Sequence, residues 1–268
     1  MKNKSRKNNN KTFSKKITRK PLNNISVQEV QINEVGPDSK GNVSITGRVN
    51  RIIQTGGPTV FVVSDGTGNL ALKGFIGPGE RAYPEIEEED IVTSVVTLGE
   101  FQGEMEGEIK KINKVSESQQ EEFLKRIKEI ELERARVVAP AFLVKTPILS
   151  KLEQRFIDAA TQIKLAIIQD RPIIVRHHND ADGYSSGFAL ERAILPLIAE
   201  QHKSVKAAWE FFQRAPCQAP FYEIDDSIRD TANSLRNVAK FSNKMPLIII
   251  ADNGSSEEDL MAIRQGKV

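Results

Sequence analysis

The first half of the chain is dominated by short stretches in which apolar and polar residues alternate. The pattern runs through "NVSITGRVNRIIQ", "TVFVVSD", "LALKGFI", "IVTSVVTLGEF" and "EGEIKKINKV". Turn-forming residues separate them, notably "GGPT" and "GTGN". Alternation with a period of two is typical of half-buried β-strands. The pattern therefore predicts five strands between about Val27 and Val115.

Five strands in this order, within about 90 residues, predict a small Greek-key barrel. The segment resembles the OB-fold of tRNA-binding and replication proteins, with "GRV" in the first strand and "VFVVSDGTGNLALKGF" across the second and third. Such barrels usually bind oligonucleotides through aromatic and cationic side chains on that face. The candidates for nucleic-acid binding are Arg48, Arg51, Phe61, Lys73 and Phe75. Either phenylalanine equally fits a role in the barrel core.

Two helical stretches follow, and both are expected to be structural. "ESQQEEFLKRIKEIELERARVV" spaces Phe123, Ile127 and Ile130 as an amphipathic helix does. "ILSKLEQRFIDAATQIKLAIIQD" carries a longer apolar stripe, and Pro147 precedes its start. The expected organisation is a tail at 1–24, a barrel at 25–116, a helical linker at 117–146 and an α/β domain at 147–268.

The second half contains two apolar runs that each end in an aspartate. "PIIVRHHNDADGYSSG" is a short β-branched run followed by ionisable side chains, and it is followed by a helical pattern. This is expected of a buried parallel strand between helices. Ligands of open α/β sheets gather beyond the carboxyl ends of the strands, where Asp180 and Asp182 would lie. Gly183 permits a tight turn, and Ser185 or Ser186 can cap the helix.

Carboxylates held close together repel one another unless a cation neutralises them. Oxygen ligands favour Mg²⁺ or Mn²⁺, and an imidazole beside them favours Mn²⁺. His177 and His178 both qualify, and the spacing does not choose between them. The alternative is an Asx-type turn in which the carboxylates only cap backbone groups.

A second segment, "MPLIIIADNGSSEEDL", repeats the design of proline, apolar strand, aspartate, glycine and serine. If the two strands are parallel neighbours, Asp252 faces Asp180 and Asp182. Three carboxylates and a histidine then form a shared cation site, half of a two-metal site that activates water. Ser255 and Glu258 fit a capping box at the start of the next helix.

Composition narrows the class of protein and its setting. Residues 1–20 carry nine lysines or arginines and no acid, although the net charge of the whole chain is only +2. This tail is expected either to be a disordered solubilising segment or to attract nucleic acid. The single cysteine, Cys217, excludes an internal disulfide framework. Neither a membrane span nor a secretion signal is evident, so we expect a cytoplasmic protein.

"VRHHNDADGYSSGFALERAI" and "LIIIADNGSSEED" resemble motifs I and II of the DHH phosphoesterases, most closely the archaeal-type RecJ-like exonucleases with an N-terminal OB-fold. The resemblance covers roughly residues 27–268. It implies that Asp180 and Asp182 each bind one metal, that Asp252 bridges both, and that His178 or its rival His177 is a further ligand. It implies a Mn²⁺- or Mg²⁺-dependent exonuclease acting on single-stranded DNA or RNA, with replication-fork proteins as plausible partners. No residue stands out as a nucleophile.

The motif that names this family, Asp-His-His, is absent before the sequence reaches "AIRQGKV". The second metal would then lack most of its ligands, so we expect this chain alone to be inactive, as part of a longer polypeptide or paired with another chain. The alternative function is a non-catalytic scaffolding protein of replication that binds single strands. A phosphoesterase of short oligonucleotides or cyclic dinucleotides would share the same chemistry.

Overall fold

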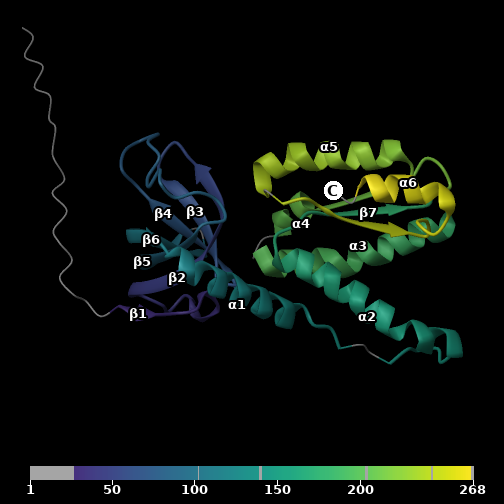
Figure 1. The fold of residues 1–268 in the computed structure, drawn as a ribbon, viewed down its shortest axis with the longest axis horizontal. Coiled ribbons are helices and arrows are strands. Elements are labelled where there is room, and N and C mark those ends of the chain that lie inside the picture. Colours follow the sequence, from purple (N-terminus) through teal and green to yellow (C-terminus); the bar gives the residue numbers. More distant parts are fainter. Residues whose placement is uncertain (1–26, 102, 139–140, 203–204, 243, 267–268) are drawn as a thin grey trace, which may run out of the picture.

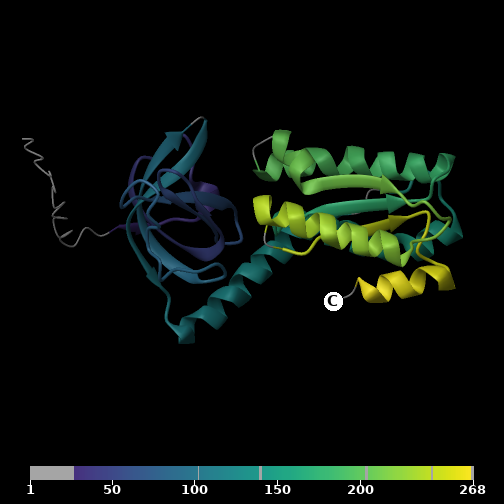
Figure 2. The ribbon, with the colours of Figure 1, turned by 90° about the horizontal axis from the view of Figure 1, so that it is seen from above.

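The computed structural model describes residues 27–101, 103–138, 141–202, 205–242 and 244–266. It has an N-terminal β-barrel and a C-terminal α/β part, joined by a helix (Figures 1 and 2). The mixed fold expected from the sequence, an OB-type barrel followed by a parallel-sheet α/β part, is confirmed. The expected basic tail lies outside the described residues. Within these residues, every helix is too short or too polar to cross a membrane.

Five strands build the barrel: β2 (Gly41–Gln54), β3 (Thr59–Ser64), β4 (Asn69–Gly74), β5 (Ile91–Phe101) and β6 (Glu104–Lys114). They are ordered β2-β3-β4-β6-β5, and pairing of β2 with β5 closes the barrel. All pairs are antiparallel except β4 with β6. Before them come strand β1 (Gln28–Glu29), parallel to β2, and the 3₁₀ turn η1 (Ile32–Glu34), neither of which the sequence pattern predicted.

The barrel core follows from the alternation in the sequence. Inward positions are filled by apolar side chains, including Ile45, Val49, Phe61, Val63, Leu72 and Val96. Phe61 is 0% exposed. The prediction that it forms a base-stacking surface is therefore wrong, because its ring fills the barrel interior and packs against Tyr83.

One helix connects the barrel with the α/β part, and a second begins that part. Helix α1 (Glu117–Ala135) follows the barrel, and α2 (Pro147–Ile168) starts the second part. Thr146 caps α2, since its hydroxyl accepts a hydrogen bond from the Leu149 amide at 3.1 Å, and Pro147 occupies the first helical turn.

The α/β part contains three parallel strands in the order β8-β7-β9. Along the chain its elements are β7 (Ile173–His177), α3 (Ala181–His202), α4 (Val205–Phe211), β8 (Phe212–Pro216), α5 (Ile224–Phe241), β9 (Leu247–Ala251) and α6 (Glu257–Gln265). The two aspartate-ended strands, β7 and β9, are parallel neighbours as expected, with His177 opposite Ala251. Strand β8 and helices α4 and α5 were not predicted.

The sheet lies between two layers of helices. Helix α5 covers one face, while α3 and α2 lie on the other (Figure 1). Val175 of β7 packs in one apolar cluster with Ile194 and Ile198 of α3. On the opposite face, Arg176 forms a buried ion pair with Asp230 of α5. Each residue of β7 is buried, so the strand is fixed from both sides.

The two parts meet at the amino-terminal ends of the parallel strands. Asp170, just before β7, accepts hydrogen bonds from Asn69 at 2.7 Å and Asn50 at 3.4 Å, both on the barrel. A cleft of about 1110 Å³ opens around this contact. Its walls include Arg51 of the barrel and His202 at the end of α3.

Candidate metal centre

The turn after β7 is built by Asp180 and Gly183. Oδ1 of Asp180 accepts a hydrogen bond from the Gly183 amide at 3.0 Å, so Asp180 caps helix α3. The expectation that Ser185 or Ser186 caps this helix is wrong. Both lie inside α3, and their hydroxyls donate to the backbone carbonyls of the preceding turn.

Gly183 is required by the closeness of the chain to itself. A Cβ atom at this position would overlap sterically with the carbonyl oxygen of His178. The absence of a side chain therefore lets α3 begin directly against the strand end, which places Asp180 beside His178.

Asp252 follows β9 in a left-handed backbone conformation, with φ of 61°. This conformation is uncommon outside glycine, although aspartate adopts it more readily than most residues. Gly254, with φ of 90°, completes the reversal into α6. The capping box of α6 is formed by Ser256 and Asp259, one residue later than the predicted Ser255 and Glu258.

Asp259 anchors this second turn. Its carboxylate accepts hydrogen bonds from the backbone amides of Tyr222 and Ser256, at 2.7 and 2.8 Å. Burial alone would raise the pKa of this carboxyl, but these hydrogen bonds outweigh it and hold the pKa below its usual value. A charged Asp259 therefore fixes the start of α6 next to the Asp252 turn.

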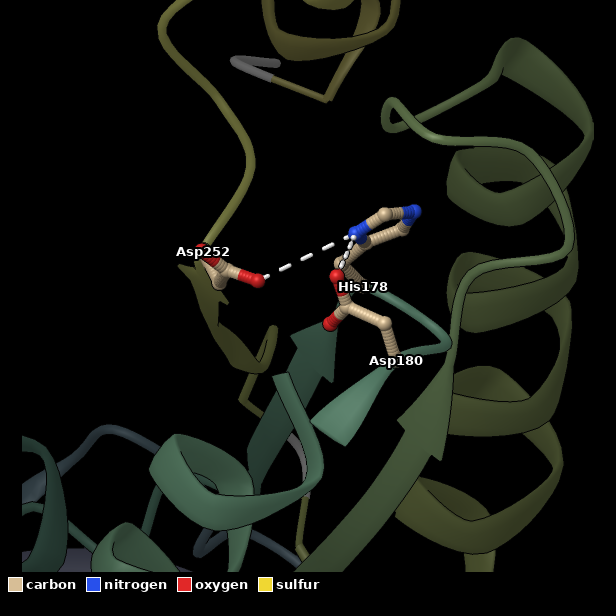
Figure 3. A group of neighbouring side chains, drawn as sticks. All are labelled: His178, Asp180 and Asp252. Carbon is tan, nitrogen blue, oxygen red and sulfur yellow. Dashed lines mark ion pairs between the residues drawn. The ribbon is translucent and has the colours of Figure 1, made fainter. Parts of the chain in front are cut away.

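His178, Asp180 and Asp252 converge at the carboxyl ends of β7 and β9 (Figure 3). Nδ1 of His178 lies 2.9 Å from Oδ2 of Asp180 and 3.9 Å from Oδ2 of Asp252. One donor atom from each residue lies within 4.8 Å of the others. We refer to these three residues as the acidic cluster.

The carboxylate of Asp180 is stabilised in its charged form. The hydrogen bond from the Gly183 amide, followed by the interactions with Asp182 and His178, lowers the pKa of Asp180. Asp180 is thus ionised at neutral pH, as a metal ligand must be. Imidazole and carboxylate together suit Mn²⁺ and related ions, so the donor set fits the cation expected from the sequence.

Asp182 is placed differently from its predicted partners. It lies in the first turn of α3, is exposed, and interacts with Asp180, but it is not part of the acidic cluster. Asp182 lies beside Asp180. Its predicted role as the ligand of a second ion stays a prediction.

The structure separates the two histidines. His177 is 0% exposed and lies on the α3 side of the sheet. Its Nδ1 lies 2.7 Å from the His178 carbonyl oxygen, its Nε2 lies 3.3 Å from Arg214, and its ring packs edge-on against Tyr184. His177 is therefore a packed structural residue, and His178 is the histidine that reaches the carboxylates.

A buried charge network supports the strand that carries the cluster. Arg176 pairs with Asp226 and Asp230 of α5, and Tyr222 donates a hydrogen bond to Asp230. Sequence reasoning missed this network. Its signal was the lone arginine within an apolar strand, together with two aspartates four residues apart in "IDDSIRD".

The predicted nucleic-acid residues of the barrel lie in different surroundings. Arg48 is mostly buried and pairs with Glu131 of α1 at 3.3 Å. Its role is therefore to fix α1 against the barrel. Arg51 lines the cleft between the two parts. Lys73 pairs with Glu106 and lies over the Phe101 ring, 4.2 Å from its centroid. Phe75 is 58% exposed.

Comparison with known proteins identifies relatives of this chain. No family model matches it. An uncharacterized protein, MJ1198, of Methanocaldococcus jannaschii is 41% identical over 227 residues, covering 84% of this chain. The chain spans 30% of the length of that relative.

Among solved structures, the DHH domain of a protein that belongs to a family of ribosomal proteins is similar. It is 39% identical, with a TM-score of 0.53, over 56% of this chain and 34% of that one. A replication protein A heterotrimer bound to single-stranded DNA matches 37% of this chain and 84% of that one, at 18% identity and a TM-score of 0.27. The first similarity shows a DHH-domain-related fold.

Proposed function

We propose that this chain belongs to a metal-dependent phosphodiesterase that acts on single-stranded DNA or RNA from an end. The observation that carries the proposal is the acidic cluster, in which His178, Asp180 and Asp252 meet at the ends of two neighbouring parallel strands. Similarity to a DHH domain supports the same chemistry.

In this proposal His178, Asp180 and Asp252 hold a divalent cation, Mn²⁺ or Mg²⁺, and Asp182 contributes to a second. Such ions supply Lewis acidity and an acidified water for in-line hydrolysis of a phosphodiester. The protein contributes preorganised ligands. The amide of Gly183 keeps Asp180 charged and oriented, and Asp252, in its left-handed conformation, lies within reach of the same cation.

The barrel supplies strand binding in this proposal, through Arg51, Lys73 and Phe75. The basic residues before Pro21 would add sequence-independent attraction to phosphates. A place in replication or repair, and replication-fork proteins as partners, follow only from the resemblance of the two sequence motifs.

One observation favours the alternative of a non-catalytic binding or scaffolding protein. The Asp180 carboxylate already caps α3, so its presence has a structural reason without any metal. A protein of this kind would bind single strands equally well with and without Mn²⁺.

The test uses the native polypeptide that contains this sequence, with end-labelled single strands of DNA and RNA. We expect Mn²⁺-dependent release of short products, and its loss in Asp252→Asn. The matched control is Asp158→Asn on α2, an exposed aspartate that is not part of the acidic cluster. Cleavage that persists in Asp252→Asn rules out the site, and metal-independent binding without cleavage supports the alternative.

A further inference from the structure

Helix α3 joins the two regions that the proposed function uses. It begins directly after Asp180 of the acidic cluster. It ends at His202, whose Nε2 lies 3.6 Å from Asp170 Oδ1 at the contact with the barrel. At 1.5 Å per residue, its 22 residues span about 33 Å. The cluster and the cleft are therefore at opposite ends of the α/β part.

The side of α3 that faces the sheet is made of small and aliphatic residues. Gly183, Gly187, Ile194 and Ile198 are its buried positions. A Cβ atom at Gly187 would lie 2.5 Å from the His177 ring, so the first turns of the helix rest directly on β7. Close packing of this kind leaves no room for larger side chains underneath. Tyr184 lies at the edge of this contact, with its ring edge-on to His177 and still partly exposed, and Phe188 is half-exposed.

Tyr184, Phe188 and Arg192 follow one another at intervals of four residues and are all exposed, so they form one row along the helix. Tyr184 is 46% exposed and Phe188 is 50% exposed. The guanidinium of Arg192 lies over the Phe188 ring, 5.8 Å from its centroid. We refer to these three residues as the α3 stripe.

The charge of Arg192 is available to a ligand. Its acidic neighbour on the helix, Glu191, pairs with Arg214 at 2.7 Å and faces away toward β8. Within the described residues Arg192 has no carboxylate partner. Two half-exposed rings followed by an unneutralised guanidinium match what a single strand offers, namely flat bases and phosphates.

We propose that the α3 stripe is a binding track for single-stranded nucleic acid, which receives the strand beside the acidic cluster and directs it along α3 toward the cleft beside the barrel. This inference rests on the proposed function and assigns it residues outside the barrel. Bases stack on Tyr184 and Phe188, and Arg192 contacts the backbone. A strand that engages both ends must span about 33 Å, or about ten nucleotides at the stacked spacing of 3.4 Å.

The experiment measures binding of fluorescent DNA strands to the native polypeptide in EDTA, so that cleavage does not enter. We expect Phe188→Ala to weaken binding about 10-fold and Phe188→Trp to restore it, because stacking on any aromatic ring is sufficient. Arg192→Gln should reduce the slope of log affinity against log salt by about 0.7. Affinity should rise with strand length up to about ten nucleotides.

The matched control is Phe156→Ala on α2, which removes an aromatic ring of similar exposure, 53%. It should bind strands as the wild type does. If Phe188→Ala binds within twofold of the wild type, the track is wrong, whatever the protein cleaves. A parallel assay of the wild type with Mn²⁺ and bis(p-nitrophenyl) phosphate reports the diesterase chemistry separately, so a failure there contradicts the proposed function and leaves the binding result valid.

Discussion

The two oxygens of Asp180 have different partners: one accepts the Gly183 amide at 3.0 Å, and the other lies 2.9 Å from Nδ1 of His178. The same side chain therefore starts helix α3 and contributes to the acidic cluster. Mutagenesis that removes the carboxylate changes both roles at once. The substitutions have to be chosen so that the two roles separate.

Asp180→Asn separates them, because asparagine caps helices as well as aspartate does but lacks the negative charge. We expect Asp180→Asn to unfold at the same temperature as the wild type without metal. We also expect Mn²⁺ to stabilise the wild type and not Asp180→Asn. Asp180→Ala should lose both. Differential scanning fluorimetry with and without Mn²⁺ measures this, and Mn²⁺-dependent stabilisation that survives in Asp180→Asn would contradict a role as ligand.

Gly183→Ala should disrupt the cluster without touching any of its side chains. The new methyl group would collide with the His178 carbonyl oxygen, so either the strand end or the start of α3 must move. We expect a loss of about 1–3 kcal/mol in the free energy of unfolding, and weaker Mn²⁺ binding. Gly99→Ala is the control, since nothing lies within 4 Å of a Cβ atom there. Equal effects of both substitutions would refute the steric argument.

Arg176→Met should destabilise the α/β part strongly. Arg176 and Asp230 have side chains only 3% and 0% exposed, so the substitution leaves buried aspartates without their cation. Breaking a buried pair from one side costs about 3–5 kcal/mol. Urea unfolding gives the value. The matched substitution Arg136→Met, at an exposed pair with Glu133, should change stability by less than about 0.5 kcal/mol.

Asp170→Asn should stabilise the protein at neutral pH. Burial raises the pKa of the Asp170 carboxyl above its ordinary value of 3.8, although His202 and Asn69 act in the opposite direction. The folded state thus binds this proton more tightly than the unfolded state does. Stability from this group is complete below pH 3.8 and is lost as the pH rises through the folded pKa.

Asparagine keeps the oxygen that Asn69 and Asn50 contact, and it tolerates the left-handed backbone at this position, where φ is 56°. Asparagine carries no charge, so the protein no longer loses the stability that a charged Asp170 costs at neutral pH. We expect the midpoint of thermal unfolding at pH 7 to rise by about 2–4 °C, and the gain to vanish at low pH. A lower midpoint at pH 7 would show that the charged form is the stabilising one.

The ionisation of His202 makes the stability of the fold depend on pH in the opposite direction. Burial lowers its pKa below 6.5, even though Asp170 and Glu210 favour the charged form. Stability from this group is present above pH 6.5 and is lost as the pH falls toward the folded pKa. We expect His202→Gln to flatten the decrease in stability as the pH falls below 6.5, measured by urea titration. An unchanged slope would exclude His202 as its source.

The sequence predicted those features that depend on local pattern. The barrel strands follow from alternation, and the pairing of β7 with β9 follows from two apolar runs that each end in an aspartate. Because parallel strands end at one edge, the convergence of Asp180 and Asp252 could also be anticipated. The choice between His177 and His178 could not be anticipated. Consecutive residues of an extended chain point to opposite faces, and the sequence does not say which face carries the site.

The errors share a physical origin in tertiary contacts. Phe61 points inward because of the register of β3, and Arg48 is neutralised by Glu131, which lies 83 residues further along the chain. Helix α5 was missed because it is held by the buried ion pairs of Arg176, which the apolar pattern does not reveal. The caps of α3 and α6 were misplaced because several polar residues near each turn satisfy the same rule, and only the backbone chooses among them.

The placement of the barrel at the far end of the sheet from the acidic cluster has a consequence for engineering. The barrel touches the α/β part near Asp170, where the strands begin, and none of the three cluster residues takes part in that contact. The barrel and the acidic cluster can therefore be altered separately. We expect that replacing the barrel with another that presents the equivalents of Asn50 and Asn69 would leave the residues of the acidic cluster in their present geometry.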